Sequence, residues 1–167
     1  MAEPFHDRTL PADRGERYAV LAQEMASVLV GEPNIVARMA TITAMLAASF
    51  PHFFWTGFYM VDPERPDSLV IGPYQGTLGC LRIAFGRGVC GTAAMTGRTQ
   101  IVPDVHAFPG HIACDSRSAS EIVVPAFDGS GRLIAVLDVD STMPAAFDEL
   151  DGRWLEAILS ATFGAGD

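Results

Sequence analysis

The residues with the greatest potential for chemistry lie between Gly79 and Glu121. This stretch contains all three cysteines of the chain, Cys80, Cys90 and Cys114, together with two of its four histidines. Glycines flank the second cysteine in FGRGVCGT, and a proline and both histidines precede the third in DVHAFPGHIACDS. A packed core requires no such concentration of glycine, thiol and imidazole, so redox or metal chemistry is the first hypothesis.

Cys90 occupies a position where a thiol can become reactive. Only the thiolate attacks, and its formation is favoured at a helix N-terminus or beside positive charge. Cys90 follows a glycine turn that we expect to open a helix, and Arg82 and Arg87 are close in sequence. We therefore expect the helix dipole to lower the pKa of Cys90.

Cys114 has a different set of neighbours. His111 lies three residues before it and His106 further back, and either imidazole could take up its proton. Asp115 follows at once, and a neighbouring carboxylate raises the pKa of a thiol. These residues alone leave the choice of nucleophile between Cys90 and Cys114 open, and simple burial is the alternative for Cys80.

Three acidic residues fall in two confident strand patterns near the C-terminal end. Glu121 opens the strand 121–127, whereas Asp138 and Asp140 share one face of the strand 132–140, because alternate strand residues point the same way. If the DGSG turn pairs these strands, the three acids line one patch. Such a patch suits an ammonium ligand or a proton donor with a raised pKa. A solvated sheet edge or a turn-capping role is the alternative.

Two aromatic residues complete the candidate pocket. Trp55 and Tyr59 are four residues apart in the strand pattern FFWTGFYMV, so they share a face of the sheet. They could form the wall of a small apolar pocket. Ordinary core packing explains them equally well.

Composition bounds the class of protein. The chain has 167 residues, of which 49% are hydrophobic and 19% charged, as expected for one compact domain. Its net charge of −9 and its scattered Lys and Arg argue against nucleic-acid binding. No apolar stretch reaches membrane-spanning length and no signal segment is evident, so we expect no membrane partner and a cytoplasmic location. An odd number of cysteines also argues against a disulfide framework.

Periodicity predicts an α+β layer design. The middle of the chain should form a mostly antiparallel sheet. The N-terminal helix pair and the C-terminal helix should cover one face, and a ligand pocket should lie on the other face under the long loop 104–120. Helices are expected at 16–30, 33–49, 89–96 and 147–163, and strands at 53–61, 69–74, 80–85, 99–103, 121–127 and 132–140.

Five strings, GPYQG, RIAFGRGVCGTAA, DVHAFPGHIACDS, SEIVVP and VLDVDS, carry a family resemblance. In order and spacing they resemble the free methionine-(R)-sulfoxide reductases, single-domain GAF-fold enzymes, over about residues 16–160. The resemblance implies a GAF-like catalytic domain at 16–163, whereas residues 1–15, which are polar and contain Pro4, Pro11 and Gly15, are expected to form a flexible arm. It also implies reduction of free methionine sulfoxide without metal or organic cofactor, a thioredoxin-like reductant and a homodimer.

The resemblance also assigns roles to individual residues. It implies that Cys114 is the nucleophile, that Cys80 resolves it as a disulfide through a sulfenic acid, and that Cys90 participates. The family's pocket acids, one of which would donate a proton, fall on Glu121, Asp138 and Asp140. Its pocket aromatics fall on Trp55 and Tyr59.

Two rival hypotheses remain at this stage. A GAF domain without catalysis would bind a small ligand as a sensor, although we expect a sensor to carry an output domain, and none is evident. The second rival is a zinc site formed by Cys80, Cys90 and Cys114 with His106 or His111. The cysteine spacing argues against it, because gaps of 10 and 24 residues match no structural zinc motif.

Overall fold

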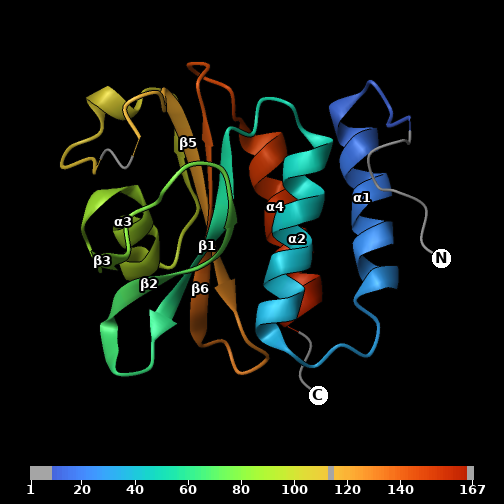
Figure 1. Ribbon diagram of the computed structural model, residues 1–167, viewed down its shortest axis with the longest axis horizontal. Coiled ribbons are helices and arrows are strands. Elements are labelled where there is room, and N and C mark those ends of the chain that lie inside the picture. Colours follow the sequence, from blue (N-terminus) through green and yellow to red (C-terminus); the bar gives the residue numbers. More distant parts are fainter. Residues whose placement is uncertain (1–8, 113–114, 165–167) are drawn as a thin grey trace.

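A six-stranded sheet of order β3-β2-β1-β6-β5-β4, antiparallel at each pairing, forms the centre of the fold (Figure 1). The computed structural model describes residues 9–112 and 115–164. The strands are β1 (Trp55–Asp62), β2 (Arg65–Gln75), β3 (Arg82–Ala84), β4 (Gln100–Val102), β5 (Ser120–Phe127) and β6 (Leu133–Ser141). The predicted α+β sheet is therefore confirmed.

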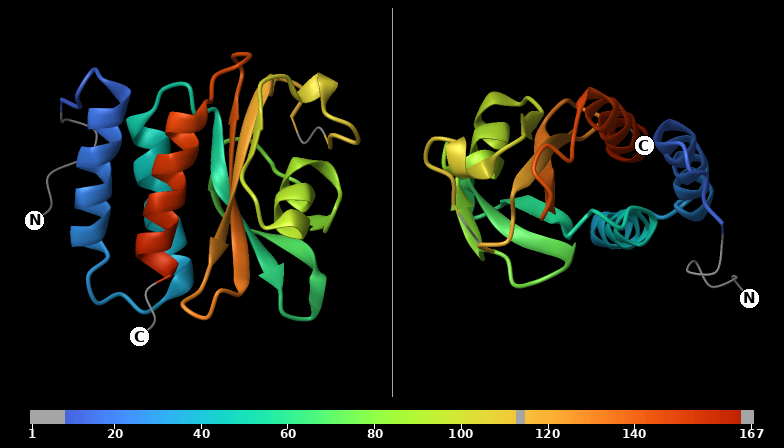
Figure 2. Two further views of the ribbon diagram at one scale, coloured as in Figure 1. Left: turned by 180° about the vertical axis from the view of Figure 1, so that it is seen from behind. Right: turned by 90° about the horizontal axis from the view of Figure 1, so that it is seen from above.

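Helices cover the two faces of the sheet unequally. The helices are α1 (Arg14–Val28), α2 (Ile35–Ser49), α3 (Gly88–Thr96) and α4 (Glu149–Phe163), with a short 3₁₀ helix η2 (Val105–Ala107) in the long loop. Helices α2 and α4 pack on one face, and α1 lies outside them as a further layer (Figure 2). Helix α3 and the long loop lie on the opposite face. The expected division between a helical side and a loop side is thus confirmed.

Local capping explains where the first two helices begin. The side chain of Asn34 accepts hydrogen bonds from the backbone N–H groups of Val36 and Ala37, so α2 starts after Asn34 rather than at Pro33 as expected. The carboxylate of Asp13 caps α1 in the same way, and this helix begins two residues before the predicted start. Each cap satisfies N–H groups that have no partner inside the helix.

One turn is shorter than the sequence indicated. Strand β2 begins at Arg65, four residues before the predicted start, because β1 and β2 are joined through Pro63 and Glu64. The carboxylate of Asp62 accepts a hydrogen bond from the backbone N–H of Glu64, which closes this tight turn. The hairpin predicted between β5 and β6 is confirmed, with Asp128 closing its turn by accepting from Ser130 and Arg132.

Both faces of the central strands are buried. On the helix face, Phe58, Val124 and Leu137 join the side chains of α1, α2 and α4 in the larger apolar cluster. On the other face, Trp55 and Tyr59 join the residues of α3 in a smaller cluster. The larger cluster fixes the helical layer against the sheet, and the smaller one fixes α3 and the long loop.

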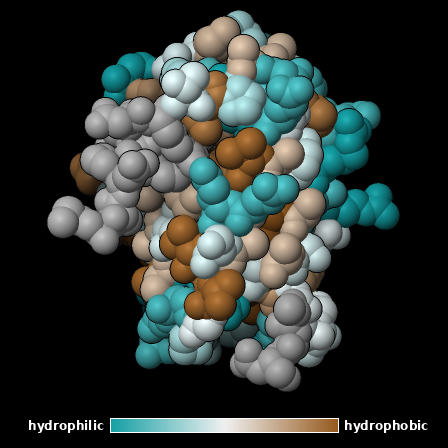
Figure 3. Space-filling model, turned by 90° about the vertical axis from the view of Figure 1, so that its right-hand side faces the viewer, coloured by the Kyte–Doolittle hydropathy of each residue, from teal (hydrophilic) through white to brown (hydrophobic). Residues whose placement is uncertain are grey.

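The outer surface on the α1 side mixes hydrophilic and hydrophobic residues (Figure 3). Exposed apolar side chains include Val28 and Val30, at the end of this helix. In the parts of the chain that the structure describes, none of the helices has the length and apolar character needed to cross a membrane.

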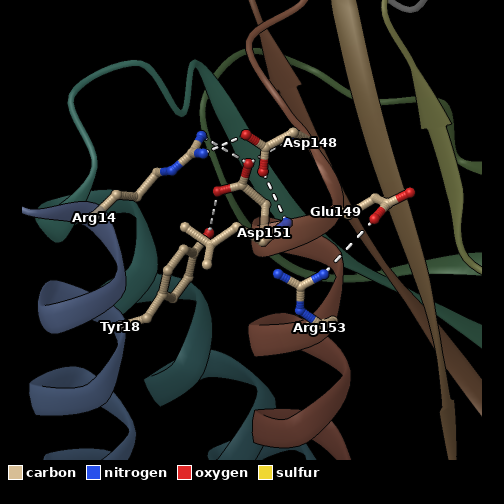
Figure 4. A network of polar contacts seen from close by, with 7 residues as sticks. Arg14, Tyr18, Asp148, Glu149, Asp151 and Arg153 are labelled. Carbon is tan, nitrogen blue, oxygen red and sulfur yellow. Dashed lines mark hydrogen bonds and ion pairs between the residues drawn. The ribbon is translucent and has the colours of Figure 1, made fainter.

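A polar network joins α1 to the beginning of α4 (Figure 4). Asp151 is fully buried, and its carboxylate accepts from the Tyr18 hydroxyl and from Arg14, both at 3.0 Å. It also accepts from the backbone N–H of Asp148, while the Asp148 side chain caps the helix in return. One carboxylate therefore closes a capping box and anchors the outer helix.

We predict that Asp151→Ala lowers the free energy of unfolding by about 2–3 kcal/mol, because it leaves the buried Tyr18 hydroxyl without its acceptor and removes one of the two carboxylates paired with Arg14. Urea denaturation measures the change. Arg153→Ala provides the matched control, since its ion pair with Glu149 on the same helix is exposed (Figure 4). Equal losses in the two variants would contradict the role assigned to Asp151.

Candidate active site

Strand register brings the three predicted acids together on the face opposite α2 and α4. Glu121 of β5 lies directly opposite Asp140 of β6, and Trp55 of β1 lies opposite Asp140 from the other side. Asp138 lies two residues before Asp140 on β6 and is opposite Gly57 of β1. Because alternate residues share a face, the acids and the tryptophan point to the same side of the sheet.

Crowding and burial change the protonation of these acids. Glu121 and Asp138 are 5% and 6% exposed, and burial raises the pKa of both carboxyls well above the ordinary range, with a further contribution from the charge of Asp140. Burial also raises the pKa of Asp140, to about 6, although a hydrogen bond with Ser118 opposes the shift. At neutral pH the cluster therefore holds protons while Asp140 is mostly ionised.

Cys90 lies in the same cluster and is a poor nucleophile there. It is the third residue of α3, it is 4% exposed, and its thiol donates to Glu121 Oε1 across 3.9 Å. Burial, followed by the charges of Asp138 and Glu121, raises its pKa well above the ordinary value. The expectation that the helix N-terminus lowers the pKa of Cys90 is wrong, because desolvation and the acids outweigh the dipole. Arg82 pairs with Asp62 instead.

Three stacked aromatic rings form one wall of the site. The ring of Trp55 lies 5.7 Å from that of Tyr59 and 5.3 Å from that of Tyr74, between centroids. Trp55 is fixed further by a hydrogen bond from its Nε1 to the carbonyl of Thr77, at 2.9 Å. A Cβ on Gly57 would lie 2.3 Å from the Cβ of Tyr74, so glycine is required for this close approach. Tyr74 lies in the GPYQG string, and its stacking on Trp55 was not predicted from the sequence.

These groups surround a pocket with about 510 Å³ of space free of protein atoms, its open mouth included. Its lining combines an aromatic wall with a few convergent polar groups, as in sites for small ligands. The long loop closes one side of the pocket, where the Nε2 atom of His111 lies 3.6 Å from Glu121 Oε2. The start of α3 contributes another side. The pocket is lined by Trp55, Tyr59, Leu78, Ile83, Arg87, Gly88, Val89, Cys90, His111, Ile112, Asp115, Ser118, Glu121, Asp138 and Asp140.

The two remaining cysteines belong to the loops around this pocket. Cys80 is half-buried between β2 and β3, and its backbone forms a hydrogen bond with the Tyr59 hydroxyl. Cys114 lies outside the described residues, but Ile112 and Asp115, before and after the gap, both line the pocket. The exposed His106 does not line the pocket.

A polar contact between loops was not predicted from the sequence. The hydroxyl of Thr77 donates to Asp115 Oδ2 at 2.8 Å, and Arg117 donates to both oxygens of the same carboxylate. The guanidinium of Arg117 in turn lies 4.7 Å from the ring centroid of Phe54. Hydrogen bonds from Arg117 and Thr77 hold the pKa of Asp115 below its ordinary range. Asp115 is therefore an ionised anchor of the long loop rather than a free charge beside the thiol.

The layered sheet and its pocket are those of a GAF domain, and the family model described as "GAF domain" matches residues 37–162. The chain is 51% identical to GAF domain-containing protein A of Dictyostelium discoideum, over 86% of this chain and 89% of that protein. It is 40% identical to the free methionine-R-sulfoxide reductase of Escherichia coli, over 89% of this chain and 87% of that enzyme.

A solved structure gives the same relationship. The free methionine-R-sulfoxide reductase of Neisseria meningitidis, in complex with its substrate, is 46% identical with a TM-score of 0.87, covering 94% of this chain and 93% of that one. The chain belongs to the free methionine-(R)-sulfoxide reductases, a family of oxidoreductases within the GAF domains. The family resemblance seen in the sequence is thus confirmed.

The raised pKa of Asp140 makes this residue costly to the unliganded fold at neutral pH. A folded-state pKa near 6 means that the folded chain keeps a proton which the unfolded chain loses at lower pH, so stability falls as pH rises toward 6. We predict that Asp140→Asn raises the free energy of unfolding by about 2 kcal/mol at pH 7.5 and has little effect at pH 4.

Denaturation midpoints at the two pH values test this, and Asp128→Asn is the control with the opposite sign. The hydrogen bond from Ser130 lowers the pKa of Asp128 to about 2, so its removal should destabilise the protein at neutral pH. An Asp140→Asn variant that is less stable than the wild type at pH 7.5 would refute the argument.

Proposed function

We propose that this protein reduces free L-methionine (R)-sulfoxide to methionine. The acid-lined pocket behind an aromatic wall carries the proposal, because it offers partners for an ammonium group and an apolar side chain together. Membership of the family and the substrate complex of the Neisseria enzyme support it. The (R) configuration is taken from the names of the relatives.

Each part of the substrate has a complementary group in the pocket. Asp140, ionised at neutral pH, would bind the α-ammonium. Backbone N–H groups at the start of α3, at Gly88 and Val89, would bind the carboxylate, since a helix N-terminus favours an anion. The sulfoxide side chain would lie along Trp55 and Tyr59.

The chemistry requires a thiolate that Cys90 does not provide. We assign the attack on the sulfoxide sulfur to Cys114, because burial among acids keeps Cys90 protonated. Glu121 or Asp138, both with a raised pKa, would give a proton to the sulfoxide oxygen. The oxygen passes to the attacking sulfur as a sulfenic acid, and methionine leaves.

The second half of the reaction restores the enzyme. The thiol of Cys80 would condense with the sulfenic acid of Cys114, releasing water and forming a disulfide. A thioredoxin-type dithiol would then reduce that disulfide by exchange and become oxidised itself. A homodimer also remains a prediction from the family resemblance.

We predict that the wild type consumes NADPH, through thioredoxin and thioredoxin reductase, with free L-methionine (R)-sulfoxide but not with the (S) form or a peptide-bound sulfoxide. Cys114→Ser should lose methionine formation, including a single turnover. Cys80→Ser should form one methionine per chain and accumulate a sulfenic acid that dimedone traps.

Cys90→Ser separates the two candidate nucleophiles. Under the proposal it keeps single-turnover methionine formation. Loss of that turnover in Cys90→Ser, with turnover retained in Cys114→Ser, would move the attack to Cys90. Binding of the sulfoxide without turnover in any form of the protein would favour the sensor hypothesis.

We predict that Thr77→Val slows disulfide formation several-fold while leaving the first methionine-forming step nearly unchanged. The hydroxyl of Thr77 ties Asp115, next to Cys114, to the segment that leads into Cys80, so its loss lets the two thiols separate. Rapid-quench measurement of methionine and of free thiols gives the two rates. Thr99→Val is the matched control, because its hydroxyl bonds Glu156 away from the pocket. Equal effects on both steps would contradict this positioning role.

A further inference from the structure

The pocket contains three metal-ligating side chains, and the proposed reduction of a sulfoxide does not need all three together. Sγ of Cys90 and one carboxylate oxygen each from Glu121 and Asp138 lie within 4.8 Å of one another. The three residues come from α3, β5 and β6, and each is at most 6% exposed. Three separate elements therefore hold the donors in a fixed and largely dry arrangement.

The distance between the sulfur of Cys90 and the nearer oxygen of Glu121 is close to that in a zinc site. With Zn–S near 2.3 Å and Zn–O near 2.1 Å, a tetrahedral site separates sulfur from oxygen by about 3.6 Å. The observed distance from Cys90 Sγ to Glu121 Oε1 is 3.9 Å. A decrease of about 0.3 Å in this distance would give the sulfur–oxygen separation of a tetrahedral zinc site.

An oxygen without a hydrogen-bond partner is a second, independent observation at this place. Asp138 is only 6% exposed and lines the pocket, and its Oδ1 atom is buried without a hydrogen-bond partner. Buried acceptors are almost always satisfied, so this atom is suited to a ligand that brings positive charge. A divalent metal ion is such a ligand.

We propose that Cys90, Glu121 and Asp138 also bind Zn²⁺, with the fourth coordination position open to the pocket. A thiolate among the ligands favours zinc over the hard cations magnesium and calcium. His111, whose Nε2 lies 3.6 Å from the second oxygen of Glu121, would orient that carboxylate from outside the coordination shell. This donor set differs from the three-cysteine site considered from the sequence, and it uses no residue of the 113–114 gap.

The proposed metal site overlaps the site proposed for the amino acid. If the protein binds methionine sulfoxide as proposed above, zinc and substrate must exclude each other, because both need the same carboxylates. Zinc would then be a reversible inhibitor of the reduced enzyme. This consequence rests on the proposed function, whereas metal binding itself does not.

Cobalt provides the probe, because Co²⁺ accepts zinc ligands and thiolate ligation gives a near-ultraviolet charge-transfer band. The protein should carry Cys80→Ser and Cys114→Ser, so that Cys90 is its only thiol. We expect one Co²⁺ per chain with that band, and its displacement by Zn²⁺. Addition of Cys90→Ser should abolish the band, and addition of the nearly isosteric Asp138→Asn should weaken binding at least about tenfold.

His106→Ala in the same background is the matched control, since this exposed imidazole does not line the pocket. It should leave the titration unchanged. Binding without a thiolate band, or a band that Asp138→Asn leaves untouched in a variant with native circular dichroism, would overturn the proposal. A normal cobalt band in this background, together with a wild-type protein that reduces no sulfoxide, would instead refute the proposed function and leave the metal site intact.

Discussion

Three carboxylates on one face of an antiparallel sheet impose the constraint on which the pocket depends. The strand register puts Glu121 of β5 opposite Asp140 of β6, and Asp138 lies two residues before Asp140 on β6. Full ionisation of all three would bring like charges together in a site that water hardly reaches, so protons or a cationic ligand must compensate. The proton donor and the ammonium site that we propose, and the unpartnered oxygen of Asp138, all follow from this one arrangement. An apolar face in its place would bind an aliphatic ligand and do no acid chemistry.

A fold can tolerate such a face only if stability comes from elsewhere. Here the opposite side of the sheet is covered by α2 and α4, with α1 outside them, and the larger apolar cluster lies between these layers. Asp151 is a buried carboxylate with a structural role. A hydroxyl, a guanidinium and a backbone N–H all donate hydrogen bonds to it. Asp151 and Asp138 thus contrast a structural acid with an acid that we propose to be functional. The first is fully partnered, whereas the second keeps one oxygen for a ligand.

Much of this arrangement could be predicted from local pattern, and the failures have physical causes. Period-two alternation was sufficient to place Asp138 and Asp140 on one face, and Trp55 with Tyr59, because side-chain direction along a strand is fixed by the backbone. The protonation of Cys90 could not be predicted, because it depends on how deeply α3 docks against the acids rather than on the helix terminus that the sequence reveals. The contact from Thr77 to Asp115 joins residues 38 apart in two irregular segments, where no periodicity specifies which groups meet. The stacking of Tyr74 on Trp55 could not be predicted, because it depends on the close approach that Gly57, which has no side chain, allows on the neighbouring strand.

The environment of Cys90 has opposite consequences for its two possible reactions. As a nucleophile it would need to lose its proton beside carboxylates that repel the resulting charge, and burial adds to the cost. As a metal ligand it would lose the same proton, but a divalent cation bound at once by Glu121 and Asp138 would reverse the sign of the local field. The thiol that is unsuited to attack an uncharged sulfoxide is therefore suited to a soft dication. The nucleophile that we propose, Cys114, belongs instead to the long loop, and under that proposal the anchoring of the loop through Asp115 would affect the chemistry.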